Sequence, residues 1–225
     1  MLAVRIAAAL VVGVLLLCVG LTLPLRWIDP PTSSFMIRYA RATPPSVVAR
    51  FDWQPMDRIA PSLAVAVIAA EDQRFLDHRG FDFASIASAL EENQSRARQR
   101  GASTITQQLA KNLYLWPGRS MIRKGLEAGM TLFLELCLPK RRILEIYLNV
   151  VQFGPGVYGA GAAATAFFDK SAAELTEHDS ALLAAVLPSP SRSSVVDPSA
   201  YVQARAAFIE RQSRQLGGDS LVADL

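Results

Sequence analysis

The chain has 225 residues, of which 23 are Lys or Arg and 20 are Asp or Glu, so its formal net charge is only +3. This mild basic excess, without a basic run that carries interleaved aromatic residues, argues against a nucleic-acid partner. The two cysteines lie in separate predicted helices and the two histidines have no partner at metal-ligand spacing, so neither a disulfide framework nor a structural zinc site is expected.

The N-terminal segment is strongly apolar. No charged residue occurs from 6 to 23, and the stretch between Arg5 and Arg26 is long enough to cross a bilayer core as a helix. No small-x-small cleavage pattern closes it, so we expect an uncleaved signal anchor over residues 1–26 in preference to a cleaved signal peptide. Arg5 and the α-amino group favour a cytoplasmic N-terminus, which would put the rest of the chain outside the cytoplasm.

Residues 27–61 hold six of the thirteen prolines and show little helical periodicity, which predicts an extended connector. Helical spacing of apolar residues then continues through residues 62–225, and no run alternates as a strand. The length of this part suits one all-α domain with a single core. Helices are predicted over 64–70, from 83 onward, and over 104–115, 120–138, 140–150, 159–168, 177–187 and 200–216.

Glu71 follows an apolar run from 65 to 70, so it is expected at the end of a buried helix. Loss of hydration there would raise the pKa of its carboxyl group toward neutrality, as a general acid or base requires. The spacing leaves a second interpretation equally open, in which Glu71 and Asp72 are helix caps or surface charges. His78 is interpreted as structural, because a lone histidine more often packs and hydrogen-bonds than catalyses.

A polar stripe occupies one face of the helix predicted after residue 103. Thr104, Gln107, Gln108 and Lys111 recur at i, i+3, i+4 and i+7, and the first two also match a capping box. Hydroxyl and amide groups recognise sugar hydroxyls directionally, and the lysine offers a cation to phosphate. Ser103 stands at the helix start, where backbone N–H groups favour an anion. We favour a binding site over the alternative of a solvated face.

The helix predicted from residue 120 carries a second charged group. Arg123, Lys124 and Glu127 lie along one side of it. An ion pair between Arg123 and Glu127 would by itself be merely structural. Two adjacent cations beside a carboxylate would nonetheless suit a site that holds a pyrophosphate and orients an acceptor.

Six segments carry a family resemblance. They occur in the order AAEDQRFLDHRGFD, GASTITQQLAKNLYL, RKGLEAGMTLFLE, KRRILEIYLN, GPGVYGAGAAATAFFDK and ALLAAVLPSPS. The chain closely resembles the peptidoglycan glycosyltransferases, which occur as a domain of class A penicillin-binding proteins and, alone behind a membrane anchor, as monofunctional biosynthetic transglycosylases. Nothing after residue 190 resembles a transpeptidase domain and no Ser-x-x-Lys motif is present, so the monofunctional type is the expected match. The resemblance implies a lysozyme-like, all-α domain behind a single transmembrane helix.

The resemblance also implies a reaction, the polymerisation of lipid II. The GlcNAc 4-hydroxyl of one lipid-linked unit attacks the anomeric carbon of the MurNAc at the reducing end of a growing glycan chain, and undecaprenyl pyrophosphate leaves. An α-pyrophosphate becomes a β-1,4 bond, so configuration inverts and a general base is needed without a covalent intermediate. Glu71 would be that base.

The other implied residues bind and orient. Glu127 is expected as a second catalytic residue that orients cations or donor, and Asp72 either tunes Glu71 or anchors the turn. Lys111, Arg123 and Lys124 would neutralise the leaving pyrophosphate. The expected ligands of sugar and phosphate oxygens are Ser103, Thr104, Gln107 and Gln108.

No cofactor is expected to be obligatory, although a divalent cation could assist the pyrophosphate. The expected partners are lipid II, the growing glycan chain and the bacterial cytoplasmic (inner) membrane, with the domain on the periplasmic face. Other wall-synthesis or division proteins stay open as partners. Three residues depart from the family pattern: Ala102 and Asp169 stand where glycine is usual, and Asp179 stands for glutamate. We expect these departures to affect the efficiency of the enzyme more than its resemblance to the family.

Two competing functions remain. A lysozyme-like lytic enzyme would also use a glutamate in a helical fold, but cleavage of uncharged linkages has less use for the cations of the two predicted helices. A non-enzymatic, membrane-anchored scaffold would have to treat the polar stripes as interaction faces. Replacing Glu71 by Gln separates them, because a scaffold would keep its function and a polymerase would lose turnover.

Overall fold

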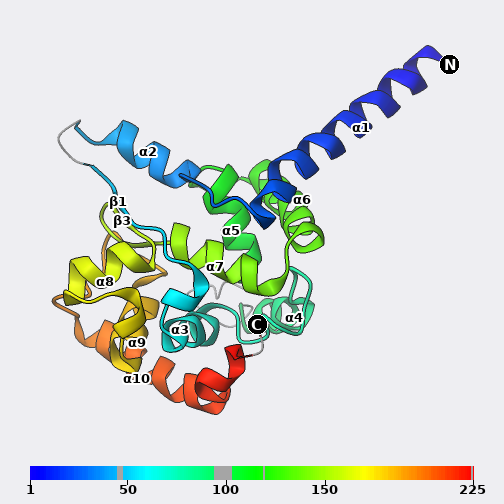
Figure 1. Cartoon of the computed structure of the whole chain (residues 1–225). Helices are drawn as coiled ribbons and strands as arrows, with labels where there is room; N and C mark the ends of the chain where they lie inside the picture. The colour runs from blue at the N-terminus through cyan, green and yellow to red at the C-terminus, as the bar shows by residue number, and fades with distance from the viewer. Residues whose placement is uncertain (45–47, 94–102, 119, 224) are drawn as a thin grey trace.

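The computed structural model describes residues 1–44, 48–93, 103–118, 120–223 and 225. One long helix projects from a cluster of shorter ones (Figure 1), and the all-α class is confirmed. The predicted helices from residue 104 onward agree with the observed bounds to within one residue at each end. The α-helices are α1 (Leu2–Thr22), α2 (Ser34–Ala42), α3 (Pro61–Glu71), α4 (Phe83–Asn93), α5 (Ile105–Tyr114), α6 (Met121–Cys137), α7 (Lys140–Val150), α8 (Ala160–Phe168), α9 (Glu177–Val186) and α10 (Ala200–Gln215).

The projecting helix is α1, which continues into a short 3-10 turn, η1 (Leu23–Arg26). The whole stretch is long and apolar enough to cross a membrane, and nearly all of it is exposed. Its last turns rest on α6. This agrees with the expected anchor, because an exposed helix that is apolar all round needs a nonpolar environment.

Polar contacts hold the end of the anchor against the domain. The Arg142 guanidinium donates to the backbone oxygen of Leu25 and to Asp29, both at 2.7 Å. The Tyr114 hydroxyl donates to the backbone oxygen of Leu21 at 3.0 Å. The end of α1 and the residues after it are therefore attached to α5 and α7 and not only tethered by the chain.

The predicted extended connector is wrong for residues 34–42, which form α2. Ser33 caps this helix by accepting from the Met36 N–H, and Met36 is buried against the domain. The helix is short and lies among prolines, so its periodicity was too brief to be recognised. In Figure 1 it extends from the domain on the side that also carries α1.

A small sheet is a second difference from the prediction of no strands. Its order is β1-β3-β2, with β1 (Arg50–Phe51) parallel and β2 (Gln152–Gly154) antiparallel to β3 (Val157–Tyr158). Strands of two or three residues are too short to show alternation in a sequence. The remaining 3-10 turns are η2 (Met56–Arg58), η3 (Ala172–Glu174) and η4 (Gly218–Val222).

Helix α3 is the centre of the domain. All seven of its residues from 63 to 69 are at most 3% exposed, and it packs against α9 and α10. Pro61 starts the helix at a position where its missing N–H costs nothing. The helix ends when Asp72 leaves helical geometry, with φ −162° and ψ 73°. The helix is apolar except for Ser62 and its last residue, Glu71, which is its first ionisable residue and lies at the edge of the core.

Candidate active site

Glu71 is the last residue of α3, and its side chain is only 13% exposed. The Gln108 side-chain amide donates to its Oε2 at 2.7 Å, and Arg205 Nη2 lies 3.5 Å from its Oε1. Burial raises the pKa of the Glu71 carboxyl group, and the contacts with Gln108 and Arg205 partly oppose that rise. The raised pKa predicted from the sequence is confirmed.

Gln108 connects Glu71 to the core. The Tyr147 hydroxyl donates to Gln108 Oε1 at 3.0 Å, and Gln108 in turn donates to Glu71. Tyr147 is fully buried, and burial raises its pKa well above the usual value, so it remains a neutral donor. This chain of hydrogen bonds fixes the orientation of the carboxylate.

Asp72 anchors the turn after α3. Its Oδ1 lies 2.8 Å from His78 Nε2, and its Oδ2 accepts from the Ile105 N–H, the first of α5, at 3.0 Å. His78 also packs edge-on against Phe75, with ring centroids 6.5 Å apart. Of the two roles left open for Asp72, these contacts describe the anchoring one, because they join the end of α3 to the start of α5.

The polar stripe on α5 divides into two halves. Thr104 and Gln107 form the predicted capping box, and the Thr104 hydroxyl also donates to the Gly80 backbone oxygen at 2.7 Å. Both residues are at most 4% exposed. Their polar atoms therefore hold the helix start, whereas Gln108 and Lys111 face open space.

Glu127 joins two cations of α6. Arg123 Nη1 lies 2.6 Å from Glu127 Oε2, and the Lys124 ammonium contacts Glu127 Oε1. Arg123 and Glu127 are buried, while the Lys124 side chain is 44% exposed and reaches Ser103 Oγ at 3.4 Å. Three of the predicted site residues are thus one ion-paired cluster, and Ser103 lies at its edge.

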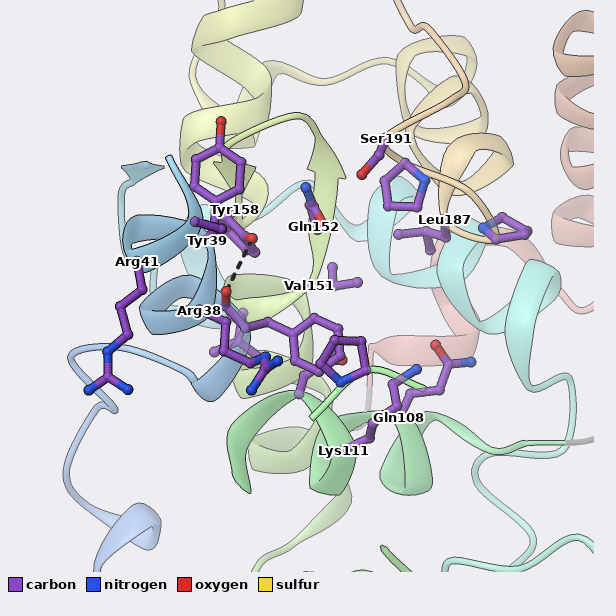
Figure 2. A pocket seen from close by; sticks show the side chains of 17 residues that line it. Arg38, Tyr39, Arg41, Gln108, Lys111, Val151, Gln152, Tyr158, Leu187 and Ser191 are labelled. Atoms are coloured by element: carbon purple, nitrogen blue, oxygen red, sulfur yellow. Dashed lines mark hydrogen bonds between the residues drawn. The ribbon is translucent and has the colours of Figure 1, made fainter. Parts of the chain in front are cut away.

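Two cavities are lined by predicted site residues. A small one, about 220 Å³, is lined by Glu71, Asp72, Ser103 and Thr104. A larger one, about 750 Å³, is lined by Gln108 and Lys111 and lies between α2, α5 and the loop after α9 (Figure 2). Gln108, which lines the larger cavity, donates to Glu71, which lines the smaller one.

Among the predicted cations, Lys111 lines the larger cavity and its charge acts on Glu71. Burial lowers its pKa, and the carboxylates of Glu127 and Glu71 partly oppose this while Arg123 and Lys124 add to it. Its ammonium group lies 5.9 Å from the centre of the Phe35 ring, within cation–π range. It makes no ion pair within the described residues, so it is available to an anion.

Sequence reasoning missed two contributors to this site. Arg205, on α10, is far from every predicted motif and showed no pattern, so only the fold brings it to Glu71. Tyr147 is not among the predicted site residues, and its hydrogen bond to Gln108 has no sequence signal.

Two of the three unusual residues are accommodated locally. Asp169 ends α8 with φ 54°, a left-handed conformation that glycine adopts most easily and Asp tolerates. Asp179 completes a capping box with Thr176 at the start of α9 and pairs with Lys170 at 2.6 Å. Ala102 lies outside the described residues. No group of three His, Cys, Asp or Glu side chains in the described ranges could hold a metal ion.

Comparison with known proteins gives one consistent family. The sequence model of the transglycosylase family matches residues 42–214. A biosynthetic peptidoglycan transglycosylase of Shewanella oneidensis is 52% identical over 211 residues, which is 93% of this chain and 91% of that protein. Proteins of the same description from Aeromonas hydrophila and Xanthomonas campestris are 55% and 54% identical, over 86% and 87% of this chain and 83% and 81% of theirs.

Proposed function

The chain belongs to the transglycosylase family and is a peptidoglycan glycosyltransferase, and from this premise we propose that it polymerises lipid II. The acceptor 4-hydroxyl forms a bond to the donor anomeric carbon, the bond from that carbon to the pyrophosphate oxygen breaks, and undecaprenyl pyrophosphate leaves. The product is a β-1,4-linked glycan, lengthened by one unit. Inversion at the anomeric carbon requires the hydroxyl to lose its proton during the attack.

Glu71 takes that proton in this proposal. The observation that carries it is a buried carboxylate with a raised pKa that lines a cavity and accepts a hydrogen bond from Gln108. A base must be deprotonated before reaction and must hold a proton well in the transition state, and a raised pKa serves the second need. The helix end behind it keeps the carboxylate from turning away.

Lys111 has a different role from Arg123 and Lys124 in this proposal. Lys111, which has no ion pair in the described part of the chain, neutralises charge on the leaving pyrophosphate. Arg123 and Lys124 already share Glu127, so this carboxylate orients them and limits their net charge. Gln108 and Ser103 have groups that line the cavities and bind sugar or phosphate oxygens. Thr104, Gln107 and Asp72 support the site by building the start of α5.

The test is an assay of detergent-purified full-length protein on lipid II, with Glu71→Gln beside it. Polymer that a muramidase digests, made by the wild type and not by the variant, is the expected result. Cleavage of preformed glycan without polymerisation would support a lytic enzyme. Equal behaviour of folded wild type and variant, with no polymer from either, would support a scaffold.

We further propose that α1 is a single-pass anchor in the cytoplasmic membrane, with the domain on the periplasmic face. Protease added to intact spheroplasts should then digest the domain, and digestion only after lysis would contradict this. No obligatory metal is part of the proposal, and polymerisation should persist in EDTA even if Mg²⁺ accelerates it. Binding to other wall-synthesis proteins stays a prediction, which co-purification would test.

A further inference from the structure

The larger cavity has a charged residue that none of the predicted motifs contains. Arg38 of α2 lines it opposite α5, and Figure 2 shows its side chain directed into the space between these helices. Arg41, one turn further along α2, points outward in the same view. No ion pair of Arg38 occurs among the described residues, and its side chain is exposed.

The helix that carries Arg38 is held in place. The Ser34 hydroxyl donates to the backbone oxygens of Asn112 and Leu115, both from α5 or its end. On the other side, Tyr39 meets Tyr158 edge-on with centroids 6.1 Å apart. Arg38 therefore projects from a fixed backbone, which lowers the entropy lost when it binds a ligand.

The positive charge of this cavity favours an anionic ligand. Its lining contains Arg38 and Lys111, with Arg41 at its edge directed away from it, and neither Asp nor Glu; the rest of the wall is largely aromatic rings, prolines and aliphatic side chains. The charges that act on Lys111 come from Glu127, Glu71 and their neighbours, and Arg38 is not among them. Arg38 comes from α2 and Lys111 from α5, so the cavity offers cations from two elements to different anionic groups of one ligand.

We propose that Arg38 binds a carboxylate of the peptide that the glycan chain carries, and that the cavity between α2 and the loop after α9 is a peptide subsite. This inference rests on the proposed function, in which Lys111 takes the pyrophosphate at the reducing end. The first peptide of the strand hangs from the sugar next to that pyrophosphate, and a peptide ends in a carboxylate. The planar fork of arginine matches a carboxylate with two parallel hydrogen bonds.

The experiment measures single-residue variants on two substrates that differ only in their peptide carboxylates. Initial rates are measured for wild type, Arg38→Ala and Arg41→Ala on lipid II and on lipid II whose peptide carboxylates are amidated. With the natural peptide, Arg38→Ala should raise KM about fivefold to thirtyfold, the size of one charge-assisted hydrogen bond, and leave kcat nearly unchanged. On the amidated substrate, wild type and Arg38→Ala should have the same raised KM.

The controls distinguish a peptide carboxylate from the other anions that Arg38 could bind. If Arg38→Ala loses as much on the amidated substrate, Arg38 binds phosphate or a lipid headgroup and the peptide subsite is wrong. Equal losses for Arg38→Ala and Arg41→Ala would mean general attraction by positive charge, which also overturns it, as would no loss at all. Arg38→Lys should recover only part of the KM, because an ammonium lacks the fork. Absence of polymer from the wild type would instead contradict the proposed function, independently of Arg38.

Discussion

Replacing Glu71 by Gln isolates the chemical role of its carboxylate. The amide is nearly the same size, and the network can be rebuilt around it, because Gln108 can turn its own amide and the Tyr147 hydroxyl can accept as well as donate. Loss of a general base lowers the rate of the chemical step by about 10²–10⁴-fold. We expect kcat to fall within that range while lipid II binding is retained.

The same variant should not be less stable than the wild type. Burial raises the pKa of Glu71 in the folded protein, so folding favours its protonated form and stability falls as pH rises above the ordinary value of 4.5. The variant has no such titration. Its melting temperature should equal or exceed that of the wild type at neutral pH, and the difference should disappear below the ordinary pKa.

Two measurements decide the matter, namely single-turnover polymerisation rates and melting temperatures across pH. A rate within about tenfold of the wild type would exclude Glu71 as the base. A lower melting temperature at neutral pH would refute the claim that burial of the charge dominates its environment. The rate of the wild type should also fall at acid pH as Glu71 becomes protonated, at a pH above 4.5.

Three further variants test the residues around the base. Arg205→Gln removes a charge that lowers the pKa of Glu71, so the acid limb of kcat/KM should move to higher pH, and an unchanged limb would contradict that contact. Asp72→Ala removes the acceptor of the first α5 N–H and should lower the free energy of unfolding by about 1–2 kcal/mol, with Asp72→Asn losing less; chemical denaturation measures both. Glu127→Gln leaves the buried Arg123 without its counter-charge and should cost about 3 kcal/mol, and a double change to Met at both positions should restore stability without activity.

The helices were predictable because each one carries a long local signal. The helical spacing of apolar residues and the capping box at Thr104 gave the bounds of α5 to α10 closely. The same logic failed for α2 and the three strands, since nine residues or fewer hold too little periodicity to stand out from loop sequence. Their formation depends on tertiary contacts such as the buried Met36.

The sequence predicted which helix face carries the site residues, but not which residues from distant elements contact them. A helical wheel grouped Thr104, Gln107, Gln108 and Lys111 on one face, yet it could not separate Thr104 and Gln107, which form the capping box, from Gln108 and Lys111, which line the larger cavity. Burial depends on what packs above a face, and that is set by distant elements. Arg205 illustrates the limit, because only the packing of α10 on α3 brings it to the base.

The position of Glu71 at the end of α3 also explains why the base needs help from outside that helix. A carboxylate at a helix C-terminus faces the negative end of the helix dipole, and the apolar helix behind it offers no hydration, so both effects favour the protonated form. The hydrogen bond from Gln108 and the charge of Arg205 lower the pKa of the carboxyl group and so oppose both effects, and these two residues come from α5 and α10. Base strength therefore depends on the assembled domain, and any ligand that shifts either contact would change the rate as well as the affinity.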